Sequence, residues 1–175
     1  MRLRLAGGEG GIGGWTLAGA ESADLDGLPT DLASRPSGEF LAHRARNSPH
    51  EHPNGVLRID HLVVFTPALG RTVTALEAAG LSLRRIREPD EPGPPVRQAF
   101  FRLGEVILEV VEDQRADAGP ARFWGLTFCV ADLDACAKLL GERIGEVHDA
   151  VQPGRQIATL RSEAGLGVPV ALISP

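Results

Sequence analysis

The sequence predicts an α+β fold in which a strand, helix, strand, strand, strand unit occurs twice, preceded by an N-terminal appendage. Two segments rich in β-branched and apolar residues, 58–65 and 122–129, can be set in one register, and each is followed by a stretch of helical periodicity. Glycine and proline are concentrated in segment 1–55 and are sparser in 56–175, so the chain changes character between them. A chain of 175 residues is long enough for one good core.

The domain boundary is expected at about residue 55, because segment 47–55 is a cluster of turn-forming residues. The appendage, 1–55, lacks sustained apolar periodicity and is expected to form one or two short strands joined by loops. The main domain, 56–175, is expected to hold two modules, at about 56–113 and 121–175. Neither module could bury both its sheet face and its helix alone, so we expect the two to assemble as one unit.

The first module is predicted to begin with strand 58–65 and to continue, after the turn at Pro67, in a helix over 69–79 that ends at Gly80. Leu103, Gly104 and Glu105 form a tight-turn signal, which predicts a hairpin of the last two strands. The three strands expected after the helix are 82–87, 96–103 and 105–112.

The second module is predicted to begin with strand 122–129 and to continue in a helix from Asp132, as N-cap, to Leu140, ending at Gly141. In this register Leu62 and Leu69 correspond to Leu126 and Leu133. The remaining strands are expected at 146–151, 156–161 and 168–173.

Composition excludes several classes of function. The formal net charge of -5 and the absence of a basic stripe argue against a nucleic-acid partner. No apolar run approaches the roughly 20 residues that span a bilayer, so no membrane association is expected. The first residues lack the apolar stretch of a secretion signal, which predicts a cytoplasmic location. Arg84, Arg85 and Arg87 are followed at once by acidic residues, and we expect them to form a solvated strand end.

Three further patterns are given structural interpretations. Residues 8–13 match the spacing of a dinucleotide-binding glycine motif, but no long helix follows, so a flexible loop is expected. His50, Glu51 and His52 lie among prolines and are read as a solvated loop, while His43 and His148 receive no role. The two cysteines, Cys129 and Cys136, fit neither a disulfide framework nor a zinc site and are expected to be reduced and buried.

His61 and Glu109 are the candidate reactive residues. Alternation along the first strand places His61 on the face that also carries Ile59, Val63 and Phe65. Glu109 is an ionisable group inside an apolar strand, where an unpaired carboxylate would cost several kcal/mol, so it requires a partner, a cation, water or a proton. A satisfied core histidine is the alternative for His61.

The segments 58–64 (RIDHLVV), 101–112 (FRLGEVILEVVE) and 128–134 (FCVADLD) resemble the vicinal oxygen chelate superfamily, which includes glyoxalase I, extradiol dioxygenases, methylmalonyl-CoA epimerase and the bleomycin-resistance proteins. The resemblance covers about 56–175 and is strongest to glyoxalase-like proteins. It implies that two βαβββ modules curve their sheets around a shared cleft. It also implies a homodimer, since modules of this kind commonly pair between chains.

The resemblance further implies a divalent metal held by one residue from the first strand and one from the last strand of each module. His61 and Glu109 match these two positions in the first module. Their counterparts in the second module are Gly125 and Ala171, which cannot bind a metal. Because a catalytic metal normally has at least three protein ligands, we expect a degenerate metal site and no cofactor. A divalent metal with a further ligand from His50, His52 or a second chain is the alternative.

Three functions are compatible with these residues. The first is an enzyme, of lyase or isomerase type, that moves a proton next to the carbonyl of a small molecule, with Glu109 as base and His61 as partner. The second is a metal-free binding module of bleomycin-resistance type, because Gly125 and Ala171 leave space for an apolar ligand. The third is a structural protein whose cleft is closed by the appendage, including Trp15 and Phe40. The expected ligand-binding residues are Phe65, Arg102, Gly125, Thr127 and Ala171.

Overall fold

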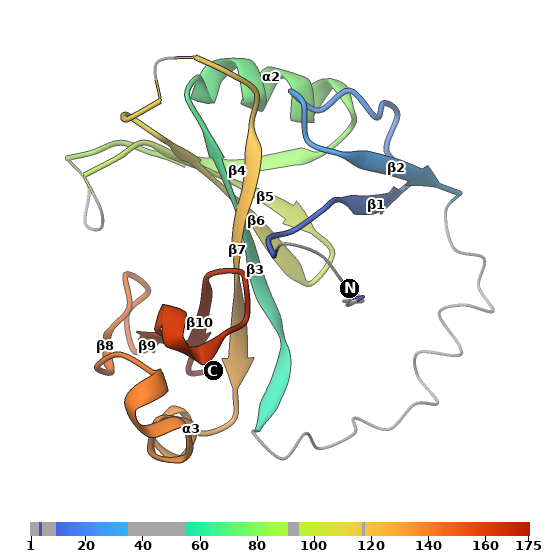
Figure 1. Ribbon diagram of the computed structural model, residues 1–175. Coiled ribbons are helices and arrows are strands. Elements are labelled where there is room, and N and C mark those ends of the chain that lie inside the picture. The colour runs from blue at the N-terminus through green and yellow to red at the C-terminus, as the bar shows by residue number, and fades with distance from the viewer. Residues whose placement is uncertain (1–3, 5–9, 35–54, 91–94, 117) are drawn as a thin grey trace.

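A computed structural model describes residues 4, 10–34, 55–90, 95–116 and 118–175 (Figure 1). The described N-terminal residues form two short strands, β1 (Trp15–Ala18) and β2 (Thr30–Ala33), which pair in parallel as a separate two-stranded sheet. The sequence predicts one or two short strands here, and two are present.

The rest of the described chain is organised around a single curved sheet of eight strands in the order β4-β5-β6-β3-β7-β10-β9-β8. Two α-helices, α2 (Leu69–Ala78) and α3 (Leu133–Leu140), accompany it, with short 3-10 turns at Gly141–Arg143 and Ser162–Ala164. The strands are β3 (Val56–Thr66), β4 (Ser82–Arg87), β5 (Gln98–Leu103), β6 (Val106–Glu112), β7 (Arg122–Val130), β8 (His148–Asp149), β9 (Gln156–Thr159) and β10 (Val170–Ile173).

The sheet repeats one pattern on either side of its centre. Strands β3 and β7, the first of each module, pair antiparallel, and each also pairs in parallel with the last strand of its own module. Val63 pairs with Glu109 in the first module, and Thr127, the counterpart of Val63 in the repeat, pairs with Ala171 in the second. The α+β class and the curved mixed sheet are therefore confirmed.

Local chemistry accounts for the turns and helix ends. Asp132 caps α3, because its side chain accepts a hydrogen bond from the backbone N–H of Ala135. Gly104, with φ of +65°, closes the β5–β6 hairpin in a conformation that favours glycine. The strand expected over 146–151 is shorter than expected: β8 has two residues, both exposed, at the outer edge of the sheet.

Both helices pack on the same face of the sheet. Leu69 and Leu76 of α2 are buried with Leu62, Leu108 and other residues of the first module. Helix α3 packs with buried residues of the second module in a smaller cluster, whose sheet members are Val130, Ala158, Val170 and Leu172. We call this the helix face. The other face carries the intervening residues of each strand, including His61 and Glu109, and we call it the helix-free face.

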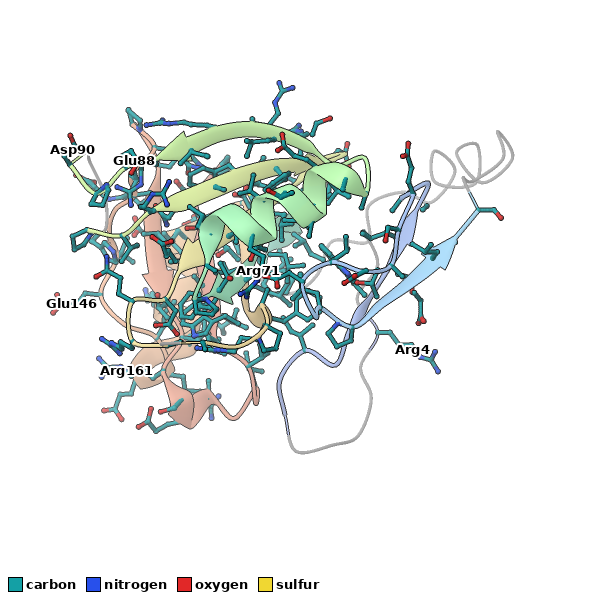
Figure 2. The ribbon with its side chains drawn as sticks, turned by 90° about the horizontal axis from the view of Figure 1, so that it is seen from above. Arg4, Arg71, Glu88, Asp90, Glu146 and Arg161 are labelled. Carbon is teal, nitrogen blue, oxygen red and sulfur yellow. The ribbon has the colours of Figure 1, made fainter. Side chains whose placement is uncertain are left out.

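The described N-terminal residues add to the helix face. Leu25 and Leu28 are fully buried in the cluster around α2, and Trp15 packs edge-on against Phe123 with 5.2 Å between ring centroids. Asp26 accepts hydrogen bonds from Arg71 and from the hydroxyl of Thr72, both on α2. Figure 2 shows β1 and β2 on the opposite side of the molecule from Glu88 and Asp90. The described part of the appendage thus covers the helix side, and Phe40 lies outside the described residues.

Replacement of Leu108 by alanine is expected to lower the free energy of unfolding by about 2–5 kcal/mol, because its fully buried side chain joins β6 to α2. Leu139→Ala is the matched control, since Leu139 is 67% exposed on α3 and should change stability by less than about 0.5 kcal/mol. Urea denaturation of both variants measures the difference. Equal losses would contradict the assignment of the core.

Candidate functional site

The site begins with an irregularity in β3. The pairing of β3 with β7 shifts between Ile59 and His61, which leaves Asp60 as the extra residue of a β-bulge. Asp60 and His61, although adjacent in the chain, direct their side chains toward each other, with 3.1 Å between Asp60 Oδ2 and His61 Nδ1. Ile59 packs against the helix-face core. The expectation that Ile59 shares a face with His61 is therefore wrong, because the bulge interrupts the alternation.

Strand pairing brings the sequence-predicted residues to the helix-free face. One row of paired positions runs across five strands, from Arg102 through Ile107, His61 and Thr127 to Ala171. The next row contains Phe100, Glu109, Val63 and Gly125, and Phe65 lies one row further along β3. All the sequence-predicted site residues therefore lie on one face of the central strands, although they do not all make contact.

His61 and Glu109 face each other from neighbouring parallel strands. His61 Nε2 lies 3.6 Å from Glu109 Oε2, and the two side chains are only 15% and 16% exposed. Because β3 and β6 are parallel and Glu109 pairs with Val63, the two side chains occupy diagonal positions, which brings their ends together. This imidazole–carboxyl pair is the centre of the site.

Glu109 is also held from the other side. The side-chain amide of Gln98 donates a hydrogen bond to Glu109 Oε1, and Arg87 Nε in turn donates to Gln98 Oε1 at 2.6 Å. Burial raises the pKa of Glu109 above its ordinary value, and the charges of His61 and Arg87, with the Gln98 hydrogen bond, only partly oppose this effect. The carboxyl is thus poised to exchange a proton closer to neutral pH than an exposed glutamate.

Arg87 corrects one expectation. It is 2% exposed, whereas Arg84 and Arg85 are exposed as expected for a solvated strand end. Arg87 is buried because the Gln98 side chain and the backbone carbonyl of Val96 accept its hydrogen bonds. Neither Gln98 nor Arg87 is among the candidate site residues from the sequence. A glutamine at a strand start carries no distinctive sequence signal, and Arg87 is expected there to be solvated.

Asp60 connects the site to the second module. Its carboxylate accepts hydrogen bonds from Arg155, at 2.9 Å to Oδ1 and 3.4 Å to Oδ2. The hydrogen bond with His61, together with the hydrogen bonds and charge of Arg155, holds the pKa of Asp60 well below its usual range despite burial. Asp60 was missed, although a carboxylate beside a histidine in an apolar strand is a readable signal. Arg155 was missed because nothing in the sequence connects it with residue 60.

The second-module half of the site is closed at Gly125. A side chain at this position would place its Cβ 2.6 Å from the carbonyl oxygen of Pro169, which also accepts a hydrogen bond from the backbone N–H of Leu126. The expectation that Gly125 leaves room for a ligand is therefore wrong, because the backbone before β10 fills the space. Thr127 is buried and pairs with both His61 and Ala171.

A separate pocket of about 190 Å³ adjoins Phe65. The Phe65 ring stacks on Trp124 with 4.9 Å between centroids, and the Arg122 guanidinium lies 5.2 Å from the Phe65 centroid. Arg122 also forms an ion pair with Asp113 at 2.8 Å. The other lining residues are Thr66, Pro67, Ala116, Ala118, Gly119 and Pro120. His61 and Glu109 are not part of this lining, and Arg102 is exposed on β5.

The donor set does not fit a catalytic metal centre. His61 Nε2 and Glu109 Oε2 could approach one cation together, but Glu109 Oε1 is engaged by Gln98, and Asp60 is engaged by His61 and Arg155. Within the described residues no three histidine, cysteine, aspartate or glutamate side chains are grouped so as to hold a metal ion. Two ligands fall short of the three that a catalytic divalent ion normally has. His43, His50, Glu51 and His52 lie outside the described residues.

The remaining sequence patterns take structural roles where they are described. Cys129 and Cys136 are buried and are not joined in a disulfide, as expected. The backbone N–H of Gly11 donates to the carbonyl of Gly167 at 2.6 Å, and strand β1, not a helix, follows this segment. His148 is exposed on β8, and its ring nitrogen lies 3.1 Å from the carbonyl oxygen of Glu146. No helix among the described residues has the length and apolarity to cross a membrane.

No family model matches the sequence, and no curated protein matches it. Solved structures do match. Methylmalonyl-CoA epimerase from Mycobacterium tuberculosis is 18% identical, with a TM-score of 0.57 over 71% of this chain and 91% of that one. A variant of the Streptomyces coelicolor methylmalonyl-CoA epimerase, in complex with 2-nitronate-propionyl-CoA, is 25% identical, with a TM-score of 0.55 over 68% and 97%.

The fold is that of the vicinal oxygen chelate superfamily. A hypothetical protein from Bacillus halodurans has it too, at 18% identity and a TM-score of 0.54 over 67% of this chain and 94% of that one. The vicinal oxygen chelate fold supports the resemblance drawn from the sequence, and the repeated β3–β6 and β7–β10 pairings are its two modules.

Glu109→Gln is expected to be more stable than the native protein, by an amount that increases as pH rises. Because the folded state raises the pKa of Glu109, the native protein disfavours the charged form, and its stability falls as pH rises from the ordinary value of 4.5 through the raised value. The difference in Tm between variant and native protein should therefore grow as pH is raised above the ordinary value of 4.5. Glu105→Gln, an exposed position in the same hairpin, is the control. A difference that does not change with pH would contradict the burial of this charge.

Gly125→Ala is expected to destabilise the fold by about 1–3 kcal/mol, because the new Cβ would collide with the backbone of Pro169 rather than with a movable side chain. Gly70→Ala, in α2 with no atom near the added Cβ, should instead be neutral or stabilising by up to about 1 kcal/mol. Thermal unfolding of both variants measures the contrast. Equal stability of the two variants would show that the space beside Gly125 is open.

Proposed function

We propose that the protein catalyses proton transfer at the carbon next to a carbonyl group of a small-molecule substrate, as an isomerase of the glyoxalase-like type. The observation that carries this proposal is a buried carboxyl, Glu109, whose pKa is raised and whose Oε2 lies 3.6 Å from His61 Nε2. A base with a pKa near the working pH is the most effective in such a transfer.

The chemistry divides between the two groups. Glu109, as the carboxylate, takes a proton from the carbon; the electrons of the broken C–H bond form the carbon–carbon double bond of an enolate. His61, when it carries a proton on Nε2, donates a hydrogen bond to the enolate oxygen, where negative charge develops. His61 then gives the proton on Nε2 to the opposite face of the carbon, which forms the isomer, and Glu109 returns the proton it removed to Nε2, 3.6 Å from its Oε2 in the free protein. The low exposure of the Glu109 side chain strengthens these interactions, because it excludes water from the carboxyl.

The comparisons support the substrate class. Two of the similar structures are epimerases by name, and another methylmalonyl-CoA epimerase structure holds methylmalonyl-CoA with an ammonium ion. A thioester carbonyl acidifies the neighbouring carbon, so that a carboxylate base can remove its proton. We therefore propose a carbonyl substrate of the thioester kind.

The proposal differs from what the vicinal oxygen chelate resemblance implies in one respect, the divalent metal. With His61 and Glu109 as the available donors and Gly125 and Ala171 opposite, we propose a degenerate metal site, and no step of the reaction passes through a metal. A homodimer and a cytoplasmic location stay predictions from the sequence.

A metal-free binding module is the second candidate, and the pocket beside Phe65 favours it. The pocket is lined by Arg122 and by the Phe65 ring, which is itself stacked on Trp124, and an aromatic lining of this kind suits an apolar planar ligand. In that case the ligand would occupy this pocket, whose lining does not include Glu109 and His61, and no proton would be transferred.

The enzyme proposal is tested by exchange of the acidic hydrogen of methylmalonyl-CoA in deuterated water, followed by NMR. Glu109→Gln should slow the exchange at least about 100-fold, while Glu105→Gln should leave it unchanged. A chelator should not change the rate. Binding without exchange would overturn the enzyme proposal in favour of the binding module, and a chelator-sensitive rate would overturn the degenerate metal site.

A further inference from the structure

We propose that Asp60 is a positioning residue that keeps a proton on Nδ1 of His61, and that Arg155 of the second module holds Asp60 in the orientation this requires. The proposal concerns the arrangement of the imidazole and not the identity of the substrate. It rests on the proposed function only for its consequence in catalysis.

The backbone supplies the first step. In a regular strand, adjacent side chains point to opposite faces, so a carboxylate at residue 60 could not reach the ring of residue 61. The register shift between Ile59 and His61 removes this restriction and allows the contact of 3.1 Å between Asp60 Oδ2 and His61 Nδ1. Both side chains are largely buried, at 11% and 15% exposure, so water competes little for the contact.

Donor and acceptor chemistry supplies the second step. An ionised carboxylate can only accept hydrogen bonds, so the nitrogen that faces Asp60 must be the one that carries a proton. Whether His61 is neutral or charged, Nδ1–H then donates to Asp60. The other nitrogen, Nε2, is left to exchange a proton with Glu109 Oε2, which lies 3.6 Å away. The imidazole thus presents one defined nitrogen to the reacting side of the site.

Arg155 supplies the third step. Its guanidinium donates from two nitrogens to the two carboxylate oxygens of Asp60, and its Nε donates to the backbone carbonyl of Ser174 at 2.8 Å. Arg155 is therefore hydrogen-bonded both to the end of the second module, at Ser174, and to the bulge residue of the first module, Asp60. Paired N–H donors of this kind orient a carboxylate as well as bind it. The second module, without ligands at Gly125 and Ala171, thus contributes to the site through Arg155.

The proposal is tested by NMR on the full chain with ¹⁵N-labelled histidine, near neutral pH, with His61 assigned from the spectrum of His61→Asn. The native protein should show a slowly exchanging proton on His61 Nδ1. In Asp60→Ala this signal should be lost, and Asp60→Asn, which retains an acceptor oxygen, should restore part of it. In Arg155→Gln, the proton should exchange with water at least about tenfold faster, as expected from the loss of a charge-assisted hydrogen bond.

Asp26→Asn is the matched control, because Asp26 is another largely buried carboxylate paired with an arginine, Arg71, but on the helix face. It should leave the His61 signal unchanged. A protected Nδ1 proton in Asp60→Ala, or unchanged exchange in Arg155→Gln, would overturn the proposal. If Asp60→Ala does not fold, the Arg155→Gln measurement decides alone.

The activity of these variants separates this inference from the proposed function. Where methylmalonyl-CoA exchange is present, Arg155→Gln should lower kcat with little change in KM, since Arg155 acts through Asp60 and His61. Where exchange is absent from the native protein, the proposed function fails while the NMR result still tests the positioning role.

Discussion

The contact between Asp60 and His61 is the constraint on which the rest of the site depends. A carboxylate buried in a sheet face is costly unless donors surround it, and here the donors are the imidazole beside it and the guanidinium of Arg155. The β-bulge makes the first of these possible, and the continuity of the eight-stranded sheet brings the second from the other module. The bulge therefore orients the imidazole of His61. It also places Asp60 where it can bind Arg155, which connects the two modules on the helix-free face.

From this contact a line of polar side chains crosses the helix-free face. It runs from Arg155 through Asp60, His61 and Glu109 to Gln98, and ends at Arg87. Arginines terminate both ends, and the carboxyls lie between them. Of the two carboxyls, burial raises the pKa of Glu109, whereas hydrogen bonds from His61 and Arg155 lower that of Asp60. Environments that separate the pKa values of two groups in this way are typical of sites that move protons.

The sequence is most informative where an ionisable residue interrupts an otherwise apolar strand. Glu109 stands out within apolar β6, and the family resemblance is what predicts that it shares a site with His61. The register between the two copies also identified Gly125 and Ala171 as counterparts of the reactive pair, and the strand pairings have this register. The bulge could not be read in the same way, because it depends on how β3 meets β7 and not on residues 59–61 alone. For the same reason the sequence does not reveal the contacts of Arg155 and Gln98, and it does not show that the backbone at Pro169 fills the space expected beside Gly125.

A double-mutant cycle between Asp60 and Arg155 tests the account most directly, because it measures the connection between the modules without reference to any substrate. The free energies of unfolding of the native protein, Asp60→Ala, Arg155→Ala and the double variant give the coupling energy. The account predicts a favourable coupling of about 1–3 kcal/mol, the range of residues that share one hydrogen-bond network. If the losses in the free energy of unfolding of the two single variants sum to that of the double variant within about 0.5 kcal/mol, the two residues act independently. That result would contradict the account.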